Sequence, residues 1–531
     1  MPSIIIIPGL SNATKRPGFF GQVVNPAGQQ SLSSQQLVVL LAGNKTSAGS
    51  MTVEGQPQQI FSADDADSLA GPGSELACMA YGIGGTGAAG GVVGGALAAQ
   101  GVQIFLGSIA EAAGVAATAT ITIAGSWTTG GTLIYRLSGI PVTVNTLPGD
   151  TATNVAANIV LAVNGNSRLP FTAANAAGVV TVTCKNVGVR GNWHSIFQVV
   201  TQMASGMTST LAGGTSLTGG GKHFTGGTGS DSPSNLLATI VAQQFDRIAA
   251  ACGDNTLDTT NLPTWRTQMN TQASPGTGIL QQLIAASNDT FGNAQSLAKT
   301  TLNDIRFQLL WGLNVETHPY VIASTFAATR AVAETIDPDS YYDSIVYSNT
   351  LPGVAPQSQG ADRASASQVE SALASGVTPL LTMADGTVRI SRSITTHCMN
   401  GTNTDFRVLD TSGTTVTDYV LQAASLLWSG SFLPGNPRVQ DNPASQLPAP
   451  KQGVAYPQLW NAALYNLLQQ LAAGTGLTTG LPILDANTVA ANPPVSQFAG
   501  GPTPHIMSAA EIVPAFNQHQ LGQQIRNVTS G

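Results

Sequence analysis

Charged residues are scarce in this sequence. The 20 lysines and arginines and the 27 aspartates and glutamates make up 9% of its 531 residues, against about 25% in an average soluble domain. A net charge of −7 with so few basic residues excludes a protein that grips the phosphate backbone of nucleic acids. Interface cores are also poor in charge. The composition therefore fits either a subunit packed against copies of itself or a secreted or surface-layer protein.

Long apolar runs, export signals and cysteine motifs are missing as well. No run of 18 apolar residues free of charge and glycine occurs, so we expect no membrane insertion. The start, MPSIIIIPGL, has no basic region and no Ala-x-Ala site, so we expect no secretory signal. The cysteines are too widely spaced for a zinc site, and they are Cys78, Cys184, Cys252 and Cys398. We expect buried thiols, with a disulfide between neighbouring subunits as the alternative.

The motifs of enzymes and cofactor sites are degenerate. Gly82–Gly87 has the glycines of a dinucleotide fingerprint, but a helix-like segment precedes it and no acidic residue follows at the required distance. Gly219–His223 resembles a phosphate loop without its first glycine and its final Ser or Thr. His397 and Cys398 are adjacent, and adjacent residues of a strand point to opposite faces. We therefore expect no catalytic residue, no cofactor and no metal, so that the protein is not an enzyme.

What the sequence does contain is alternating strand and helix patterns interrupted by a β-rich stretch. They predict an α/β (α+β) core with an inserted, mostly β domain and extended arms at both ends. The expected segments are an N-terminal arm at 1–30, a first α/β part at 31–115, the inserted domain at 116–205, a Gly/Ser/Thr-rich linker at 206–234, a second α/β part at 235–440, and a C-terminal helix and arm at 441–531. Within the second part, we expect a helix at 236–252 and a hairpin at Asp385-Gly386.

The two termini carry short β-prone runs. The first is made of Ile4, Ile5, Ile6 and Ile7, bounded by prolines on both sides. An exposed run of this kind would aggregate, so we expect it to add to the edge of a neighbouring subunit's sheet or to form the first strand of its own domain. The second is made of Gln524, Ile525, Arg526, Asn527 and Val528, and we expect it to be the strand of a C-terminal arm.

Two longer stretches resemble a protein family. One runs from Leu302-Asn303-Asp304-Ile305-Arg306 to Asp337-Pro338. The other contains Gly376-Val377-Thr378-Pro379-Leu380 and then Asp385-Gly386-Thr387-Val388-Arg389-Ile390-Ser391-Arg392-Ser393-Ile394-Thr395-Thr396-His397. Together they resemble the contractile tail sheath proteins of long-tailed phages, especially the Mu-like branch. That pattern has a helix, a Gly-Ile/Val-Thr turn, an Asp-Gly hairpin and a strand ending Arg-x-Ile-Thr-Thr. This chain departs from it after Thr396, where His397-Cys398 replaces the usual tyrosine, and after residue 440.

The resemblance implies a structural protein without a catalytic site. Subunits of such a sheath stack as rings around a tail tube, add their arms to neighbours' sheets, and contract to drive the tube through the host envelope. The implied partners are further copies of this chain, the tail tube protein, and the baseplate and neck or terminator proteins. The implied location is the virion tail, assembled in the host cytoplasm. The inserted β-rich domain at 116–205 is expected to be the outer domain, to face outward and to be dispensable for assembly. Arg389 and Arg392 are candidates for charge pairs across subunits, with simple solvation as the alternative.

Other functions remain open at this point. Sheaths of phage-derived devices, pyocin-like or type VI-like, share the same sequence features. If the chain were a surface-layer or adhesive β-rich protein, we would expect an export signal. If it were a Rossmann-like enzyme, we would expect it to bind a nucleotide.

Overall fold

The structure is a computed structural model of the chain. It describes residues 37–85, 102–199, 203–274, 277–340, 350–357, 360–406, 408–428, 438–442, 454–475, 477, 480–499 and 505–509. The expected arm strands at 4–7 and 524–528 lie outside these residues. The chain forms two compact units: one comprises 36–335 and 340–414, and the other comprises 1–35, 336–339 and 415–531. Each unit is described by itself.

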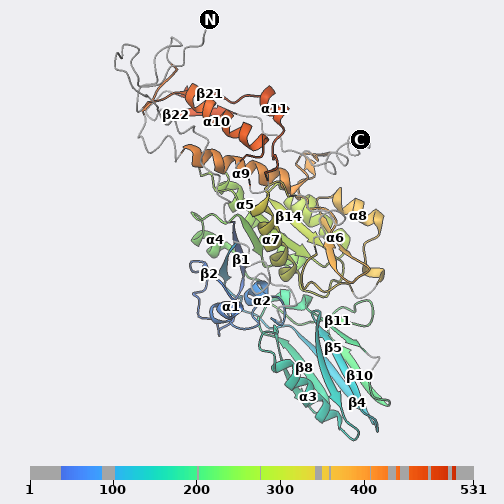
Figure 1. Cartoon of the computed structure of the whole chain (residues 1–531). Coiled ribbons are helices and arrows are strands. Elements are labelled where there is room, and N and C mark those ends of the chain that lie inside the picture. Colours follow the sequence, from blue (N-terminus) through green and yellow to red (C-terminus); the bar gives the residue numbers. More distant parts are fainter. Residues whose placement is uncertain are drawn as a thin grey trace, which may run out of the picture. The chain divides into compact units, whose positions relative to one another are not determined.

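An eight-stranded sheet forms the centre of the first unit (Figure 1), with strand order β16-β15-β14-β13-β12-β1-β3-β2. The six inner strands are parallel, and the two edge strands are antiparallel to their neighbours. The strands are β1 (Val38–Asn44), β2 (Gln58–Ile60), β3 (Gln103–Ile109), β12 (Arg247–Ala250), β13 (Gln282–Ser287), β14 (Phe307–Trp311), β15 (Thr378–Thr382) and β16 (Val388–Ile390).

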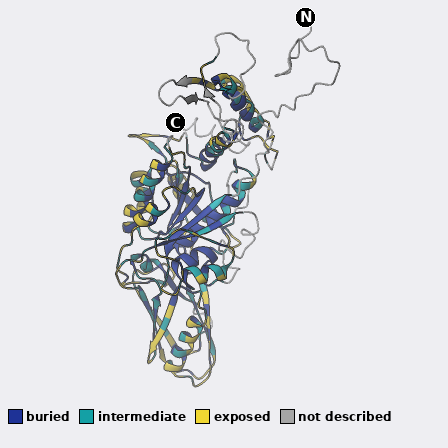
Figure 2. Ribbon diagram, turned by 90° about the vertical axis from the view of Figure 1, so that its left-hand side faces the viewer, coloured by how far each residue is buried: buried dark blue, intermediate teal, exposed yellow. Residues whose placement is uncertain are grey.

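The inner strands are apolar along their whole length because both faces of a parallel sheet are covered. Val39, Leu40 and Leu41 of β1 are all fully buried. Leu40 is paired with Ile248 of β12 on one side and with Phe105 of β3 on the other. Figure 2 shows these strands as the most deeply buried part of the unit.

Helices connect these strands, and side-chain caps fix where several of them begin. Ser62 and Ser365 each form a capping box, and Asp254 caps the 18-residue helix α5. The elements are α1 (Ala63–Ala70), α2 (Glu75–Tyr81), α4 (Ser234–Thr239), α5 (Asn255–Gln272), α6 (Phe291–Gln295), a π-helical segment (Ser296–Leu302), α7 (Pro319–Ile336), a 3₁₀ turn (Gly360–Asp362) and α8 (Ala366–Leu373). A small hairpin, β17 (Met399–Asn400) and β18 (Asn403–Thr404), follows β16.

A buried ion triad joins α7 to the sheet. Glu334 accepts a hydrogen bond of 2.6 Å from Nε of Arg330 and one of 2.6 Å from Nε of Arg247 on β12. Arg330 is 1% exposed and also donates to Gln308 of β14 at 3.1 Å. The amide nitrogen of Gln308 in turn donates a hydrogen bond of 2.9 Å to the hydroxyl of Ser393. The scarce charges of this chain therefore lie partly inside it.

Between β3 and β12 the chain forms a separate pair of sheets, which we call the β module (residues 115–228). One sheet has the order β10-β4-β8-β7 and the other β11-β9-β5-β6. Helix α3 packs against both β6 and β7. The elements are β4 (Thr118–Gly125), β5 (Gly131–Leu137), β6 (Ile140–Thr146), α3 (Ala152–Asn164), β7 (Phe171–Ala176), β8 (Val179–Cys184), a 3₁₀ turn (Val189–Trp193), β9 (Ser195–Val199), β10 (Met207–Ala212) and β11 (Lys222–His223).

The β module leaves and rejoins the chain at one point. Val115 and Thr228 form an antiparallel bridge, with N–H to O distances of 3.2 and 3.0 Å. We call this pair the stem. The module therefore interrupts the chain without altering the strand order of the eight-stranded sheet.

Two expectations about this region differ from the structure. Residues 206–234, expected to be a linker, contain β10 and β11, which pair with β4 and β9 of the module. Their Thr- and Ser-rich composition suits a half-exposed antiparallel strand. The expected helix at 236–252 is also wrong: α4 ends at Thr239 and β12 begins at Arg247. A short apolar run fits a buried strand as well as a helix.

The second unit is mainly helical. Its helices enclose an apolar core in which Trp428 and Trp460 meet edge to face, with ring centroids 5.2 Å apart. The helix expected within the C-terminal segment 441–531 is α10 (Pro457–Ala472). The remaining elements are α9 (Thr411–Leu427), α11 (Ala486–Ala491), and the strand pairs β19 (Arg438–Val439) with β20 (Val454–Ala455) and β21 (Val495–Ala499) with β22 (His505–Ala509).

Candidate functional site at the switch point of the sheet

The eight-stranded sheet has one position where ligands commonly bind in folds of this kind. Strand β1 has β3 on one side and β12 on the other, so the connections from these strands diverge there. In open α/β sheets the crevice beyond the carboxyl ends of such strands is the usual ligand site. Here that crevice contains Asn44, the last residue of β1, together with Glu75 of α2 and Leu257 of α5.

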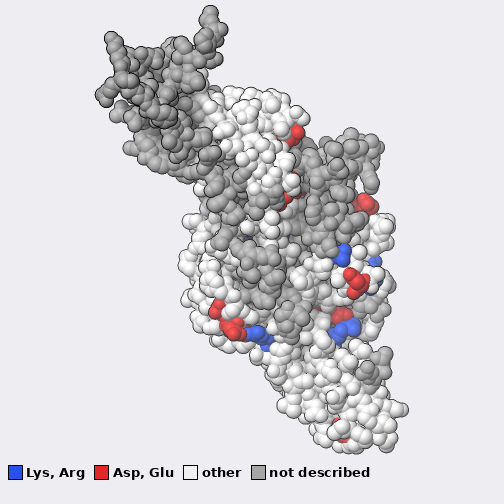
Figure 3. All heavy atoms as spheres, viewed as in Figure 1, with Lys and Arg blue, Asp and Glu red and all other residues white. Residues whose placement is uncertain are grey.

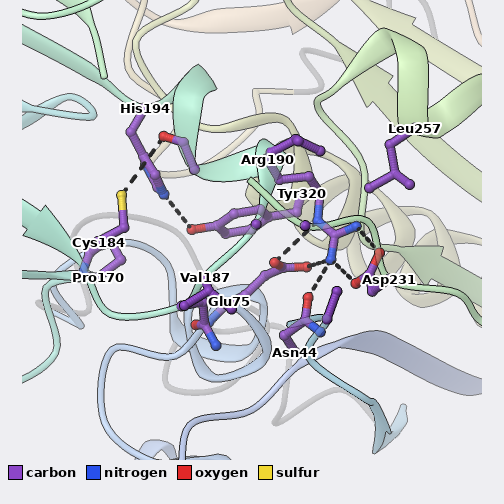
Figure 4. Close-up of a pocket in the computed structure, with 16 residues that line it drawn as sticks. Asn44, Glu75, Pro170, Cys184, Val187, Arg190, His194, Asp231, Leu257 and Tyr320 are labelled. Carbon is purple, nitrogen blue, oxygen red and sulfur yellow. Dashed lines mark hydrogen bonds and ion pairs between the residues drawn. The ribbon is translucent and has the colours of Figure 1, made fainter. Parts of the chain in front are cut away.

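The crevice is filled by a side chain of the β module. Arg190, from the 3₁₀ turn that precedes β9, reaches into it and is 6% exposed (Figure 4). The free volume left is about 20 Å³, which is room for about one water molecule. No space remains for a nucleotide or another organic cofactor.

Arg190 is hydrogen-bonded on all sides of its guanidinium group. Asp231 accepts hydrogen bonds from both terminal nitrogens of Arg190. Nη1 lies 2.8 Å from Oδ1, and Nη2 donates to Oδ2. Glu75 accepts from Nε at 3.2 Å, and Asn44 accepts from Nη2. Asn261 of α5 donates to Asp231 at 3.3 Å. Such planar, forked pairing is what arginine does better than lysine.

The carboxyl groups of the crevice have displaced pKa values. Burial raises the pKa of Glu75 to about 7, although the charge of Arg190 acts in the opposite direction. Burial also raises the pKa of Asp258 to about 8; its Oδ2 accepts a hydrogen bond of 3.0 Å from the Gly253 N–H. Burial acts on Asp231 too, but the paired guanidinium outweighs it and lowers the pKa of this carboxyl. Arg190 thus pairs with two acids, and more closely with Asp231 than with Glu75.

Aromatic rings and histidines pack beside the crevice. His194 lies 4.4 Å from His318 and 4.8 Å from Phe171, measured between ring centroids. Its Nδ1 is 2.8 Å from the Ser138 hydroxyl, and its Nε2 is 3.5 Å from the hydroxyl of Tyr320. Burial lowers the pKa of His194 to about 3 and also lowers that of His318. Both rings are therefore neutral near pH 7 and act as packing groups that join the module to α7.

Two further arginines join the module to the rest of the unit through ion pairs. Arg136 of β5 makes a two-pronged pair with Glu316, at 2.9 and 2.8 Å. Arg168 pairs with Asp67 at 2.7 Å and with Asp64, whose side chain is 90% exposed. The module is thus fixed by one buried arginine and two more exposed ones.

Other chemistry of the described residues does not converge on a reactive site. Burial raises the pKa of every cysteine thiol, and none of the four is in a disulfide. In the part of the chain that the structure covers, no three metal-binding side chains gather. Among the same residues, no helix combines the length and the apolar character needed to cross a bilayer.

The motifs considered in the sequence have ordinary structural places. Gly82 and Gly84 follow the end of α2, with φ values of 77° and 79°, rather than opening a helix. His223 ends β11 and is buried. His397 lies 3.3 Å from Asp405, whereas the backbone N–H of Cys398 donates to Asn303, so the two neighbours do not share a site.

The candidate charges near the hairpin are paired within the chain. Arg392 makes a two-pronged pair with Asp410, with both distances 2.7 Å. Arg389 lies 3.7 Å from Asp385, which is on the Asp-Gly turn. A role of these arginines across subunits stays a prediction. The role of Arg190 was not predicted from the sequence. The signal that points to it there is that it is a lone arginine, between Val189 and Gly191, in a nearly uncharged stretch.

Comparison with other proteins finds solved structures only. No family model and no curated protein matches the sequence. The anti-feeding prophage helical sheath in its contracted state is similar in fold, with 11% identity, a TM-score of 0.46, and coverage of 95% of this chain and 97% of that one. Sheath tail proteins from Desulfitobacterium hafniense and Listeria innocua each have 11% identity and a TM-score of 0.42. They cover 90% of this chain, and 97% and 94% of their own chains.

Proposed function

We propose that this protein is the structural subunit of a contractile tail sheath. Copies of the chain stack as rings around a tail tube and contract to drive the tube through the host envelope. The proposed partners are further copies of the chain, the tube protein, and the baseplate and neck or terminator proteins. The proposed place is the virion tail, after assembly in the host cytoplasm. Within this family we propose the Mu-like branch, whose sequence pattern the run from Gly376 to Thr396 resembles.

The observation that carries this proposal is that the sheath-like sequence run forms one folded unit. Helix α8 ends at Leu373, Gly376 turns the chain with φ of 73°, and β15 and β16 form the hairpin around Asp385-Gly386. The run then returns to the turn, because the backbone of Thr396 lies directly against Gly376. The resemblance thus covers a complete structural element and not scattered residues.

The nature of the surface supports a subunit that packs against copies of itself. Figure 3 shows few charged side chains on the described surface it displays. Monomers normally keep a charged surface for solubility, whereas interface cores are depleted in charge. A surface-layer protein shares this property, so assembly around a tube is the distinguishing feature.

The filled crevice counts against a Rossmann-like enzyme. A dinucleotide would need the space at the carboxyl ends of β1 and β12, and Arg190 already occupies it. The site therefore supports a structural role for this α/β fold.

The proposed motor needs no nucleotide. Arms that add strands to a neighbour's sheet are held by main-chain hydrogen bonds, which persist while rigid domains move. About 25 cal/mol is gained per Å² of apolar surface buried, so an extra ~200 Å² per subunit would favour contraction by about 5 kcal/mol. Summed over many subunits, this drives the tube.

Electron microscopy of the purified chain at high concentration, alone and co-expressed with a candidate tube protein, tests the proposal. We expect hollow striated tubes in one or both preparations. The variant Ile5→Asp/Ile6→Asp removes the apolar character of the N-terminal run and should abolish tubes. Leu161→Asp places a charge of the same sign on an exposed position of α3, where the side chain is 70% exposed, and should leave tubes intact.

Monomers in both preparations would overturn the proposal, and single-layered flat arrays would favour a surface-layer protein. If tubes form, the neighbouring genes separate a phage tail from a pyocin-like or type VI-like device, because only the phage requires capsid and portal genes.

A further inference from the structure

The chain contains two Asn-Gly pairs, and the structure places them in different surroundings. The pairs are Asn164-Gly165 and Asn400-Gly401. An asparagine that precedes glycine can cyclise, because glycine has no Cβ to keep its backbone nitrogen away from the asparagine side chain. The reaction also needs that nitrogen and that side chain to be unrestrained. The two pairs can therefore be compared within one molecule.

Asn164 ends helix α3, and its side chain is held at both polar atoms. Its Nδ2 donates a hydrogen bond of 2.9 Å to the carbonyl of Ala173, and its Oδ1 accepts one of 2.8 Å from the N–H of the same residue. The N–H of Gly165 donates to the carbonyl of Leu161 at 2.8 Å. Both reacting groups are thus occupied, so cyclisation at this pair requires the end of the helix to open.

Asn400 and Gly401 lie at the tip of the hairpin formed by β17 and β18. Both residues are exposed, and Gly401 has φ of 63° with open space where a Cβ would be. Within the described part of the chain, no residue hydrogen-bonds to the side chain of Asn400 or to the N–H of Gly401. At this pair both reacting groups are available at the surface.

The hairpin is held at its base and not at its tip. The side chain of Asn303 donates to the carbonyl of Met399 at 2.9 Å and accepts from its N–H at 3.1 Å. Beyond Met399 the strands have one more pair, Asn400 with Asn403, and among the described strands they join no larger sheet. A two-stranded hairpin by itself is marginally stable, so its tip opens at little cost in free energy. Opening frees Asn400 to rotate toward the next backbone nitrogen.

We propose that Asn400-Gly401 is a site of spontaneous modification, at which the asparagine becomes aspartate or isoaspartate. The backbone nitrogen of Gly401 attacks Cγ of Asn400 and forms a C–N bond that closes a succinimide ring. The bond from Cγ to the side-chain nitrogen breaks, and ammonia leaves with the proton of the Gly401 nitrogen. Water then adds to one ring carbonyl and breaks its bond to that nitrogen: attack at Cγ gives aspartate, and attack at the backbone carbonyl gives isoaspartate.

Either product changes the surface of a chain with few charges. Both products add a carboxylate to an exposed tip of a chain whose net charge is −7. Isoaspartate also carries the backbone through the former side chain, which lengthens it by one carbon between residues 400 and 401. The pairing of Asn400 with Asn403 depends on the original spacing, so we expect isoaspartate to abolish it. This inference does not depend on the proposed sheath function, because it concerns the single chain.

Peptide mapping by mass spectrometry of the whole, unassembled chain tests the site. The chain is incubated in mildly alkaline buffer, and the readout is the mass increase that accompanies replacement of the side-chain amino group by a hydroxyl. In the folded chain we expect Asn400 to convert at least ~10-fold faster than Asn164, because only its tip opens readily. In urea, where neither pair is held, we expect the two rates to become similar. Chromatography separates the aspartate and isoaspartate peptides.

Two variants serve as controls. Asn303→Gly retains the positive φ of 42° but removes the hydrogen bonds to the base of the hairpin. It should raise the rate at Asn400 toward that in urea and leave Asn164 unchanged. Asn400→Gln has a side chain one carbon too long for the same ring, so its peptide should show no comparable mass increase.

The comparison of the two pairs in the natural chain is decisive without either variant. Equal rates at Asn400 and Asn164 in the folded chain would overturn the proposal. An Asn400 peptide that converts only in urea would overturn it as well, whether or not the chain forms tubes.

Discussion

Buried arginines tie together distant parts of this charge-poor chain. Arg190 joins the β module to β1, α2 and the stretch before α4 through Asn44, Glu75 and Asp231. Arg330 joins α7 to β14 through Gln308 and to β13 through Gln282. Charged side chains are rarely buried unless paired, and each of these is paired several times over. They act as cross-links whose removal leaves the partner's charge uncompensated.

We expect Glu334→Gln to destabilise the first unit strongly. The substitution keeps the shape of the side chain but leaves Arg247 and Arg330 as two buried cations without their shared carboxylate. Breaking a buried pair in this way costs about 3–5 kcal/mol. Urea unfolding of the whole chain, followed by tryptophan fluorescence, measures it, since Trp127, Trp265 and Trp311 are all buried in this unit.

Asp385→Asn is the control for that measurement. Asp385 is 57% exposed and pairs with Arg389 at 3.7 Å, and exposed pairs contribute about 0–1 kcal/mol. Equal losses for the two variants would show that the buried triad contributes no more than a surface pair does.

At the scale of elements, the turn between α8 and β15 requires glycine for two reasons. Gly376 has φ of 73°, and a Cβ there would lie 2.5 Å from the carbonyl oxygen of Thr396. Gly386 has φ of 80° but nothing within 4 Å of the same position. We expect Gly386→Ala to cost about 1 kcal/mol from backbone strain alone and Gly376→Ala to cost at least ~1 kcal/mol more, because backbone must move.

Thermal unfolding of the two glycine variants checks this order. A Gly376→Ala protein as stable as Gly386→Ala would mean that the return of Thr396 against the turn is not part of the folded state, and it would weaken the structural basis of the resemblance.

Secondary structure could be predicted wherever the residue pattern fitted either a helix or a strand but not both. The Asp-Gly hairpin and the helix α10 follow from turn chemistry and apolar spacing. The strand at 247–250 was not predicted, because its four residues are all buried and show no alternation of apolar and polar side chains. Helix α5 was not predicted, since it is polar and contains Pro263; its cap at Asp254 was its only clear local signal.

The Arg190 site could not be predicted because its parts are far apart in the chain. Asn44, Glu75, Arg190 and Asp231 come from four separate segments, and the eight-stranded sheet brings them together only through the parallel pairing of β1 with β3 and β12. The sequence predicted a β-rich insertion, but nothing local indicated that one of its arginines would fill the crevice of the core.

At the scale of the whole molecule, the stem makes removal of the β module feasible. Replacing residues 116–227 by Asn-Gly closes Val115 and Thr228 with a hairpin turn. We expect this deletion alone to be unstable, since Glu75 and Asp231 lose Arg190. The same deletion with Glu75→Gln and Asp231→Asn should recover about 3–5 kcal/mol, measured by urea unfolding.

The repaired deletion also tests whether the module faces outward in a sheath. We expect it still to form tubes in the electron microscope. A repaired variant that folds but never assembles would contradict the outward placement, and a deletion that unfolds at the same urea concentration with and without repair would contradict the role assigned to Arg190.

The stem has a consequence for how such proteins change over evolutionary time. Because the chain departs and returns at one hydrogen-bonded pair, residues between Val115 and Thr228 can be gained or lost without reordering the eight strands of the sheet. Charge sets the limit on that freedom. A descendant that sheds the module also sheds Arg190, so Glu75 and Asp231 must become neutral in the same lineage. The presence of the β module and the presence of these buried charges are therefore inherited together.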